Sequence, residues 1–351
     1  MICTRLDTAL EALTASYEQV CIVGDSHVRP SFSRFGHSDE WPALWLEMGE
    51  GQKSLETVQA VWDFLFAQSM TRRGLLVCIG GGALTDLAGF ASATYKRGID
   101  WIAVPTTLLA MVDASTGGKT GFNYYGLKNS IGVFAPPIET LIWPEWLKTL
   151  PPREFLSGFA EMLKTGLVAH QAVSSRLPDH LWNSLLQYDL ETMDTAALPP
   201  LIAACVAAKE RIVAADPKEE GLRKVLNFGH TFGHAMEEIQ IVNPQPSRPP
   251  FLHGFAVLYG MIAELYLSVT KLGCPQEPLQ QLTQLMLHYY GRPECQCSDR
   301  QRLVALMQQD KKNERTAEIN CTLLRDIGQP VINQVITPDE ANEAWDYLFS
   351  L

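Results

Sequence analysis

Three short apolar runs constrain the first half of the chain more than any other feature. VCIVGD (20–25), LLVCIGGG (75–82) and WIAVPTT (101–107) each end in a turn. Residues 54–70, between the first two runs, place apolar side chains at helical spacing. Strand, helix and strand in this order predict an α/β domain with a parallel sheet and helices on its faces. We expect the following helix residues to face the core: Leu55, Val58, Trp62, Leu65 and Phe66.

The second half of the chain has a different character. After about residue 150, helical patterns dominate, and β-branched runs are rare until AEINCTLL at 317–324. The chain has 351 residues, which is long for one typical domain. We therefore predict an α/β domain at 1–150 and a mostly helical domain at 151–351. The proline-rich stretch 242–250 is predicted to be a loop inside the second domain. The predicted helical segments are 198–213, 229–240, 254–271, 276–288 and 300–309.

Composition and charge exclude several classes of function. The net charge of −11 argues against nonspecific nucleic-acid binding, which needs a basic face. Residues 1–24 lack a signal-peptide core, and the apolar runs fall short of the ~20 residues of a membrane span. Cys21, Cys78 and Cys205 lie in apolar runs, as reduced core cysteines do. These features predict a cytoplasmic protein without a membrane segment.

A glycine-rich turn, IGGGALTDLAGF (79–90), follows the second apolar run and leads into a helix. Glycines at such a turn let backbone N–H groups approach a phosphate at the helix N-terminus. The spacing differs from the G-x-G-x-x-G fingerprint, so a purely structural turn is the alternative. Asp86, together with Thr106 and Thr107 just past the next strand, favours a dinucleotide at this edge of the sheet.

Histidines and a carboxylate suggest a metal site in the second half. His230 and His234 are four residues apart and share a helix face. His253 and Glu161 each lie among apolar residues, where a polar group needs a partner. Two imidazoles and a carboxylate could form a zinc site with an open position. Histidine pairs at this spacing are more often a hydrogen-bonded helix face, so spacing alone leaves both interpretations open.

Basic residues are scattered along the chain, and each alone would be a surface charge. If Lys119, Lys209, Arg223 and a C-terminal lysine converged, they would bind phosphate or carboxylate. Lys164 follows Glu161 by three residues on the same helix face. We expect it to contact substrate rather than to pair permanently with Glu161. Loss of a weak intrahelical pair would leave stability nearly unchanged.

Seven segments in order resemble the 3-dehydroquinate synthase family of the sugar phosphate cyclase superfamily, from about residue 20 to 330. They are GGGALTDLAGFASATYKRGI, VPTTLLAMVDASTGGKTGFN, GLKNSIG, SGFAEMLKTG, GLRKVLNFGHTFGHAMEE, LHGFAV and MQQDKK. The resemblance implies a dinucleotide-binding domain, a helical domain and a site between them. It also implies a homodimer in which Arg97 reaches the neighbouring subunit's site.

The resemblance further implies the site residues. A Zn²⁺ or Co²⁺ ion would be held by Glu161, His230 and His253. The NAD positions match Asp25, Glu50, Lys53, Gly81, Gly82, Asp86, Thr106, Thr107, Lys119, Lys128, Trp146 and Thr149. The catalytic and substrate positions match Asp113, Lys119, Asn129, Lys164, Lys209, Arg223, Asn227, His234 and Lys311 or its neighbour Lys312. Phe255 stands where the family usually has Glu, which leaves open how His253 is oriented.

The activity implied by the resemblance is conversion of 3-deoxy-D-arabino-heptulosonate 7-phosphate to 3-dehydroquinate and phosphate. NAD would oxidise the substrate transiently, phosphate would be eliminated, and reduction and aldol closure would follow. One alternative is another sugar phosphate cyclase, of the 2-epi-5-epi-valiolone or 2-deoxy-scyllo-inosose synthase type. A metal-dependent alcohol dehydrogenase of the glycerol dehydrogenase type and a non-catalytic metabolite-binding protein are more distant alternatives.

Overall fold

The computed structural model describes residues 1–32, 41–125, 127–169, 181–242, 251–294, 299–309 and 318–351. These residues form two compact units, Met1–Pro151 and Pro152–Leu351. We call them unit 1 and unit 2 and describe each by itself. The predicted proline-rich loop, apart from its first residue, lies outside the described residues. The NAD-binding role of one unit and the metal- and substrate-binding role of the other stay predictions.

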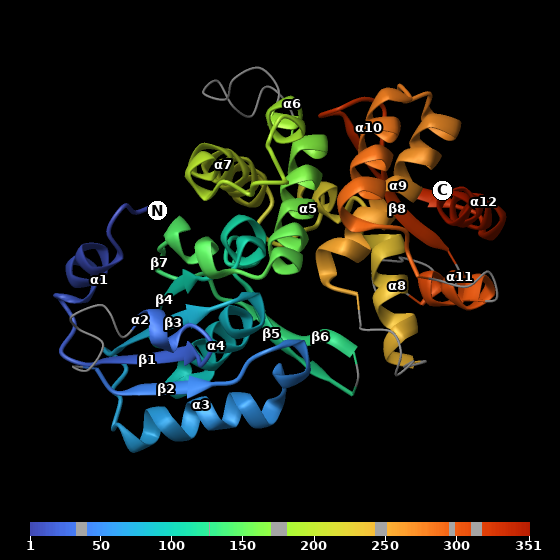
Figure 1. The fold of residues 1–351 in the computed structure, drawn as a ribbon. Helices are drawn as coiled ribbons and strands as arrows, with labels where there is room; N and C mark the ends of the chain where they lie inside the picture. Colours follow the sequence, from blue (N-terminus) through green and yellow to red (C-terminus); the bar gives the residue numbers. More distant parts are fainter. Residues whose placement is uncertain (33–40, 126, 170–180, 243–250, 295–298, 310–317) are drawn as a thin grey trace. The chain divides into compact units, whose positions relative to one another are not determined.

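Unit 1 is built on a parallel sheet, as predicted (Figure 1). Among its described residues, the strand order is β2-β1-β3-β4-β7, and every pairing between neighbours is parallel. The strands are β1 (Val20–Asp25), β2 (Ala43–Leu46), β3 (Leu75–Gly80), β4 (Asp100–Pro105) and β7 (Glu139–Thr140). The helices are α1 (Leu6–Thr14), α2 (Arg29–Phe32), α3 (Leu55–Ala67) and α4 (Gly82–Thr94). The three apolar runs are β1, β3 and β4, so this part of the α/β prediction is confirmed.

The core of unit 1 lies between the sheet and helices α3 and α4. Alternate strand residues, such as Val23 and Cys78, point into this layer because side chains alternate along a strand. The predicted face of α3 is partly wrong, since Leu55 is 40% exposed and Phe66 is 61% exposed. The fully buried residues of α3 are Val58, Val61 and Leu65. The buried stripe is therefore narrower than the apolar pattern, and Phe66 packs instead on the edge of the Tyr95 ring.

A hairpin of β5 (Lys119–Tyr124) and β6 (Leu127–Phe134) follows β4 and was not predicted. Its outward side is unusually apolar for an exposed strand, with Leu127 at 56% and Phe134 at 54% exposure. This pattern does not alternate as that of a half-buried strand would, so these residues carry no local strand signal. The hairpin carries three predicted site residues, Lys119, Lys128 and Asn129.

Unit 2 is mostly helical, as predicted (Figure 1). Its helices are α5 (Pro152–Val168), α6 (Leu181–Leu186), α7 (Leu198–Ala215), α8 (His230–Val242), α9 (His253–Leu272), α10 (Glu277–Leu285), α11 (Arg300–Gln308) and α12 (Pro338–Ser350). The predicted strand near 317–324 is β8 (Ile319–Leu324), which pairs antiparallel with β9 (Pro330–Ile336). Helix α9 has the length and apolarity of a membrane span, but 72% of its most apolar window is buried inside the protein. We therefore interpret α9 as a core helix.

Close backbone contacts bring α5, α8 and α9 together. A Cβ added to Gly254, at the start of α9, would lie 1.9 Å from the Ser157 carbonyl oxygen of α5. The Gly254 N–H donates to the Ser157 side-chain oxygen at 3.0 Å. Gly229, just before α8, has φ +80°, and its added Cβ would lie 2.8 Å from the Val257 carbonyl oxygen of α9. Glycine is therefore required where these three helices meet.

Gly254→Ala is expected to destabilise unit 2, because the neighbouring atoms are backbone and cannot rotate away. Overpacking of this kind costs about 1–3 kcal/mol or more. Gly51→Ala is the matched control, since a Cβ at Gly51 would meet nothing within 4 Å. Thermal unfolding of both variants measures the difference. Equal midpoints for the two variants would contradict the close approach of α9 to α5.

Candidate metal centre and active site

Three potential metal ligands meet within unit 2. Glu161 lies in the middle of α5, and His230 and His253 are the first residues of α8 and α9. One ligand atom from each residue lies within 4.8 Å of the other two. Glu161 Oε1 is 3.8 Å from His230 Nε2 and 3.4 Å from His253 Nε2. Two imidazoles and a carboxylate directed at one point match the donors of catalytic zinc sites.

The other nitrogen of each imidazole faces an acceptor. His230 Nδ1 lies 3.1 Å from the Phe228 carbonyl oxygen, and His253 Nδ1 lies 3.3 Å from both carboxylate oxygens of Glu237. Since these oxygens only accept, we assign the proton to each Nδ1. Each Nε2 then faces Glu161, and once a metal ion displaces any proton there it offers the lone pair that a metal ligand requires.

Glu237 was missed by the sequence analysis and resolves the question raised by Phe255. Phe255 is buried against Tyr290, with the Arg153 guanidinium 5.4 Å from the centre of its ring. It takes no part in holding His253, and Glu237 supplies that contact from α8. A signal was present in the sequence, because Glu237 follows His230 by seven residues and so lies on the same helix face.

The charge at this point favours a cation. Burial lowers the pKa of His253, but the carboxylates of Glu237 and Glu161 outweigh burial and raise that pKa to about 10. A divalent metal ion is attracted by the same carboxylates and binds the neutral imidazole, so it competes with the proton. The residues present therefore fit a metal ion in both donor type and charge.

His234 lies beside the three ligands, one turn along α8. Its ring centre is 5.3 Å from that of His230 and 6.4 Å from that of His253. His234 is half-buried, and its catalytic role stays a prediction. The predicted substrate contact at Lys311 lies outside the described residues.

Lys164 corrects one expectation from the sequence. Its ammonium group forms an ion pair with Glu161 Oε2, and both side chains are almost fully buried, at 1% and 0% exposure. The premise of a weak surface pair is therefore wrong, because a buried charge needs its partner. The two oxygens of Glu161 are divided, since Oε2 faces Lys164 and Oε1 faces the imidazoles.

Three more predicted substrate residues lie on elements that contact one another and α5. Lys209 is buried on α7, and Arg223 is buried in the 3₁₀ turn η7 (Leu222–Asn227). Arg223 donates to the Pro217 carbonyl oxygen at 2.8 Å. Asn227 donates to Glu219 at 2.7 Å. Buried cations in this number are unusual for structural roles alone, which supports an anionic ligand.

The predicted cofactor residues of unit 1 gather at the carboxyl edge of its sheet. Asp25 ends β1, Gly81 and Gly82 follow β3, and Thr106 and Thr107 follow β4. Because the strands are parallel and in register, these positions share one edge. Helix α4 begins at Gly82, so its N-terminal N–H groups lie at the same edge and suit a phosphate.

A hydrogen-bond network joins this edge to the β5–β6 hairpin. The buried Lys53 ammonium contacts both the Asp86 carboxylate and the Asn129 side-chain oxygen. Asn123, which was not predicted, donates to Glu50 and accepts from the Asn129 N–H, both at 2.9 Å. The structure thus brings together three predicted cofactor residues and one predicted substrate residue.

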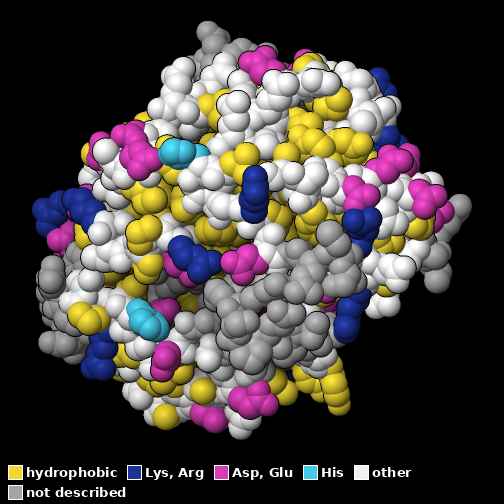
Figure 2. All heavy atoms as spheres, turned by 45° about the vertical axis from the view of Figure 1, so that its right-hand side comes forward, with side chains coloured by type: hydrophobic (Ala, Val, Ile, Leu, Met, Phe, Trp, Pro, Cys, Tyr) yellow, Lys and Arg dark blue, Asp and Glu magenta, His cyan; other side chains and the backbone are white. Residues whose placement is uncertain are grey.

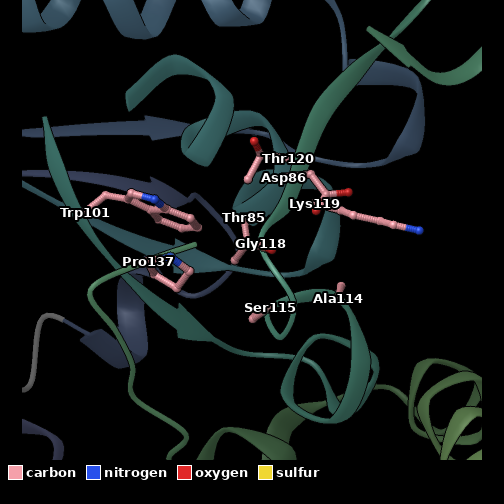
Figure 3. Close-up of a pocket in the computed structure, with 9 residues that line it drawn as sticks. All are labelled: Thr85, Asp86, Trp101, Ala114, Ser115, Gly118, Lys119, Thr120 and Pro137. Carbon is pink, nitrogen blue, oxygen red and sulfur yellow. The ribbon is translucent and has the colours of Figure 1, made fainter. Parts of the chain in front are cut away.

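Figure 3 shows a pocket beside this edge. It is too small to hold a water molecule, and its lining residues are Thr85, Asp86, Trp101, Ala114, Ser115, Gly118, Lys119, Thr120 and Pro137. The exposed Lys119 side chain extends away from Trp101 and Pro137 (Figure 3). The pocket itself therefore cannot hold a nucleotide, and the predicted NAD site depends on the sheet edge.

The remaining predicted residues of unit 1 lie on turns and strands around the sheet. Asp113 is half-buried in the π-helical turn η3 (Ala110–Ala114), and Lys128 is half-buried on β6. Trp146 is buried in the 3₁₀ turn η4 (Pro144–Thr149) and accepts a bond from Thr149 through its carbonyl oxygen. Their roles toward cofactor and substrate stay predictions.

Arg97 lies at the other end of the sheet. It is exposed, has φ +68°, and lies three residues before Asp100, the first residue of β4. The glycine turn and the two threonines lie at the opposite ends of β3 and β4, so Arg97 is remote from them. This position agrees with a role outside its own subunit's cofactor site, which stays a prediction.

Two protein families match the chain, one toward its N-terminus and one toward its C-terminus. The N-terminal 3-dehydroquinate synthase family matches residues 43–157, and the C-terminal family matches residues 158–313. The chain belongs to the 3-dehydroquinate synthase family. All three candidate metal ligands fall in the C-terminal match, and the glycine turn falls in the N-terminal match.

Individual relatives agree with the family. A 3-dehydroquinate synthase of Parabacteroides distasonis is 40% identical over 99% of this chain and 96% of its own length. One of Methylacidiphilum infernorum is 37% identical over 87% of this chain and 80% of its own length. Among solved structures, 2-epi-5-epi-valiolone synthase from Streptomyces hygroscopicus, with NAD⁺ and Zn²⁺ bound, has a TM-score of 0.81 at 27% identity. The alignment covers 100% of this chain and 96% of that chain.

Lys164→Ala is expected to destabilise unit 2 strongly, because it leaves the buried Glu161 charge without its cation. Breaking a buried pair in this way costs about 3–5 kcal/mol. Lys148→Ala is the control, since Lys148 forms an exposed pair with Glu145 at the same three-residue spacing. Denaturant unfolding compares the two variants. A loss for Lys164→Ala no larger than that for Lys148→Ala would show that the pair is not buried in solution.

Glu237→Gln is expected to weaken metal binding by about 10- to 100-fold, because outer partners of ligating histidines contribute affinity of this size. Glu238→Gln removes the same charge one residue along α8 and is the control. Competition titration with a zinc chelator measures both affinities. If Glu237→Gln binds Zn²⁺ as tightly as Glu238→Gln, the contact with His253 has no part in metal binding.

Proposed function

We propose that this chain is a 3-dehydroquinate synthase that uses NAD and a divalent metal ion, Zn²⁺ or Co²⁺. The substrate is 3-deoxy-D-arabino-heptulosonate 7-phosphate, and the products are 3-dehydroquinate and phosphate, so the enzyme is a carbon–oxygen lyase. One observation carries the proposal. A carboxylate and two imidazoles from three separate segments point at one position, in a chain that matches this family over nearly its full length.

Unit 1 supplies the proposed nucleotide site. The N-terminal N–H groups of α4, after Gly81, offer donors to the pyrophosphate of NAD. Thr106 and Thr107 offer hydroxyl groups at the adjacent strand end. The Lys53–Asp86 ion pair fixes the hairpin residue Asn129 against this edge. A tightly held cofactor suits the reaction, which is redox-neutral overall and needs NADH to return its hydride.

Unit 2 supplies the proposed metal and anion site. When bound, NAD⁺ accepts a hydride and the metal ion polarises the oxygen of the carbon being oxidised. Glu161 Oε1 and the two Nε2 atoms would hold the metal ion, and Glu237 and the Phe228 carbonyl keep both imidazoles oriented. The buried Lys164, Lys209 and Arg223 bind phosphate or carboxylate, because a dianion that leaves during the reaction needs cations. His234, beside the ligands, is placed to exchange a proton with substrate.

The competing proposal is another sugar phosphate cyclase, acting on a substrate without a carboxylate. Similarity to the solved 2-epi-5-epi-valiolone synthase favours it as the second choice. The greater identity to 3-dehydroquinate synthases and the presence of Lys119, Asn129 and His234 favour the first.

On the face shown in Figure 2, basic side chains are interspersed with acidic ones rather than gathered in one patch. This surface gives no support to a nucleic-acid partner. We also propose a cytoplasmic location, on the reduced core cysteines noted in the sequence.

Phosphate release is the test of this proposal. The protein with NAD⁺ and Zn²⁺ is expected to release phosphate from 3-deoxy-D-arabino-heptulosonate 7-phosphate. His253→Ala is expected to lose both bound zinc and phosphate release, because it removes one of three ligands. Release from sedoheptulose 7-phosphate but not from the heptulosonate would favour the competing cyclase. Retention of stoichiometric zinc by His253→Ala would refute the ligand assignment.

We also propose that the enzyme is a homodimer in which Arg97 binds substrate phosphate in the partner's site. A planar guanidinium binds phosphate through two hydrogen bonds, and lysine is a poor substitute. Arg97→Lys is therefore expected to lower turnover at least tenfold, about the effect of 1.4 kcal/mol. The exposed Arg72→Lys is expected to behave as wild type.

Mixing inactive Arg97→Ala and His253→Ala subunits separates a role across the interface from a role within one chain. A mixed dimer has one site with both residues intact if Arg97 acts across the interface, so partial activity should return. Light scattering establishes the dimer, and tagged subunits establish exchange. Absence of activity after proven exchange would place the effect of Arg97 within its own chain.

A further inference from the structure

A second buried carboxylate lies behind the metal ligands, on the core helix α9. Glu264 has 0% exposure, and its two carboxylate oxygens accept hydrogen bonds from backbone N–H groups at the start of α8. Gly229 N–H donates to Oε2 at 2.7 Å, and Thr231 N–H donates to Oε1 at 3.3 Å. These two residues flank His230 directly. The peptide groups on both sides of a metal ligand are therefore held by one side chain.

The start of α8 needs such a partner. The first N–H groups of a helix have no acceptor within the helix, and their dipoles favour a negative charge. Gly229 has φ +80° and packs against the backbone of α9, and its N–H bond is buried, where an unpaired donor would be costly. Glu264 supplies the charge from within α9, and its own burial is offset by these hydrogen bonds.

We propose that Glu264 is a positioning residue for the metal site, acting through His230. The inference rests on the proposed metal-dependent function. His230 is oriented by two contacts close to its own backbone, namely its Nδ1 bond to the Phe228 carbonyl and the clamped peptides on either side. Rotation of the first turn of α8 would move Nε2 away from Glu161 Oε1 and disturb the Nδ1 contact. Glu264 prevents that rotation, so it sets the affinity and geometry of the site without touching the metal.

Glu264→Gln is the primary test, because it keeps the shape and one acceptor but turns an amide N–H₂ toward a backbone N–H. Ser268→Ala is the matched control. Ser268 is also 0% exposed and lies one turn further along α9, where its hydroxyl accepts from the Leu324 N–H. The same hydroxyl donates to the Glu264 backbone carbonyl at 2.6 Å, so its loss removes two buried hydrogen bonds of α9 but leaves the Glu264 carboxylate on the start of α8. Both variants are expected to unfold at lower temperature than the wild type.

Co²⁺ alone is the probe, added to metal-free full-length protein and followed by its visible absorption, which reports ligand geometry. Glu264→Gln is expected to bind Co²⁺ about tenfold more weakly than wild type and with a changed spectrum. Loss of an outer partner of a ligating histidine lowers metal affinity by about 10- to 100-fold, and the smaller value applies because Glu264 acts through the backbone. Ser268→Ala is expected to bind with wild-type affinity and spectrum. Wild-type affinity and spectrum for Glu264→Gln would overturn the proposal, as would equal losses in both variants.

The design separates this inference from the proposed function. If wild-type protein binds no Co²⁺ and releases no phosphate, both are overturned. If wild-type protein binds Co²⁺ and Glu264→Gln binds it equally well, only the role of Glu264 is overturned. Should Glu264→Gln fail to fold, Glu264→Asp replaces it under the same criteria, because its shorter side chain keeps the charge but cannot span both N–H groups.

Discussion

The buried carboxylate of Glu161 is the interaction on which unit 2 depends. A charge without solvent is costly unless it is paired and hydrogen-bonded. Glu161 is 1% exposed, and its two oxygens face different partners, with Lys164 on one side and the imidazoles of His230 and His253 on the other. The helix that carries Glu161 must therefore be met by α8 and α9 at this point. The same need for charge compensation makes the point a candidate metal site.

The helices keep this meeting point through backbone contacts rather than through side-chain packing alone. Gly254 allows α9 to begin against α5, next to the turn that carries Glu161. Glu264 fixes the first turn of α8 by binding its backbone N–H groups. Glu237, on α8, then orients the ring of His253 at the start of α9. The two candidate histidine ligands are thus held at both backbone and imidazole, which is the preorganisation that a metal site requires.

Much of the scaffold could be predicted from the sequence, and the reasons for the failures are physical. The buried strands β1, β3 and β4 are continuous apolar runs with turns, so their signal is local. The exposed apolar β5–β6 hairpin breaks that pattern, and the exposure of Phe66 shows that an apolar stripe can be wider than the buried face. Spacing and apolar surroundings suggest a zinc site at Glu161, His230 and His253 but leave a hydrogen-bonded helix face open, and the resemblance to a family then implies the full ligand set. The burial of Lys164 and the contacts of Glu264 depend on helix packing, which no local pattern encodes, whereas Glu237 left a local signal because it shares a helix face with His230.

The central claim is that Glu161, His230 and His253 bind one metal ion. Anomalous diffraction at the zinc absorption edge, from crystals grown with Zn²⁺, tests it most directly. We expect one strong peak about 2.0–2.2 Å from Glu161 Oε1 and from the Nε2 atoms of both histidines, with Lys164 still paired with Oε2. A zinc-loaded crystal with its peak elsewhere, or with either Nε2 directed away from the ion, would contradict the account.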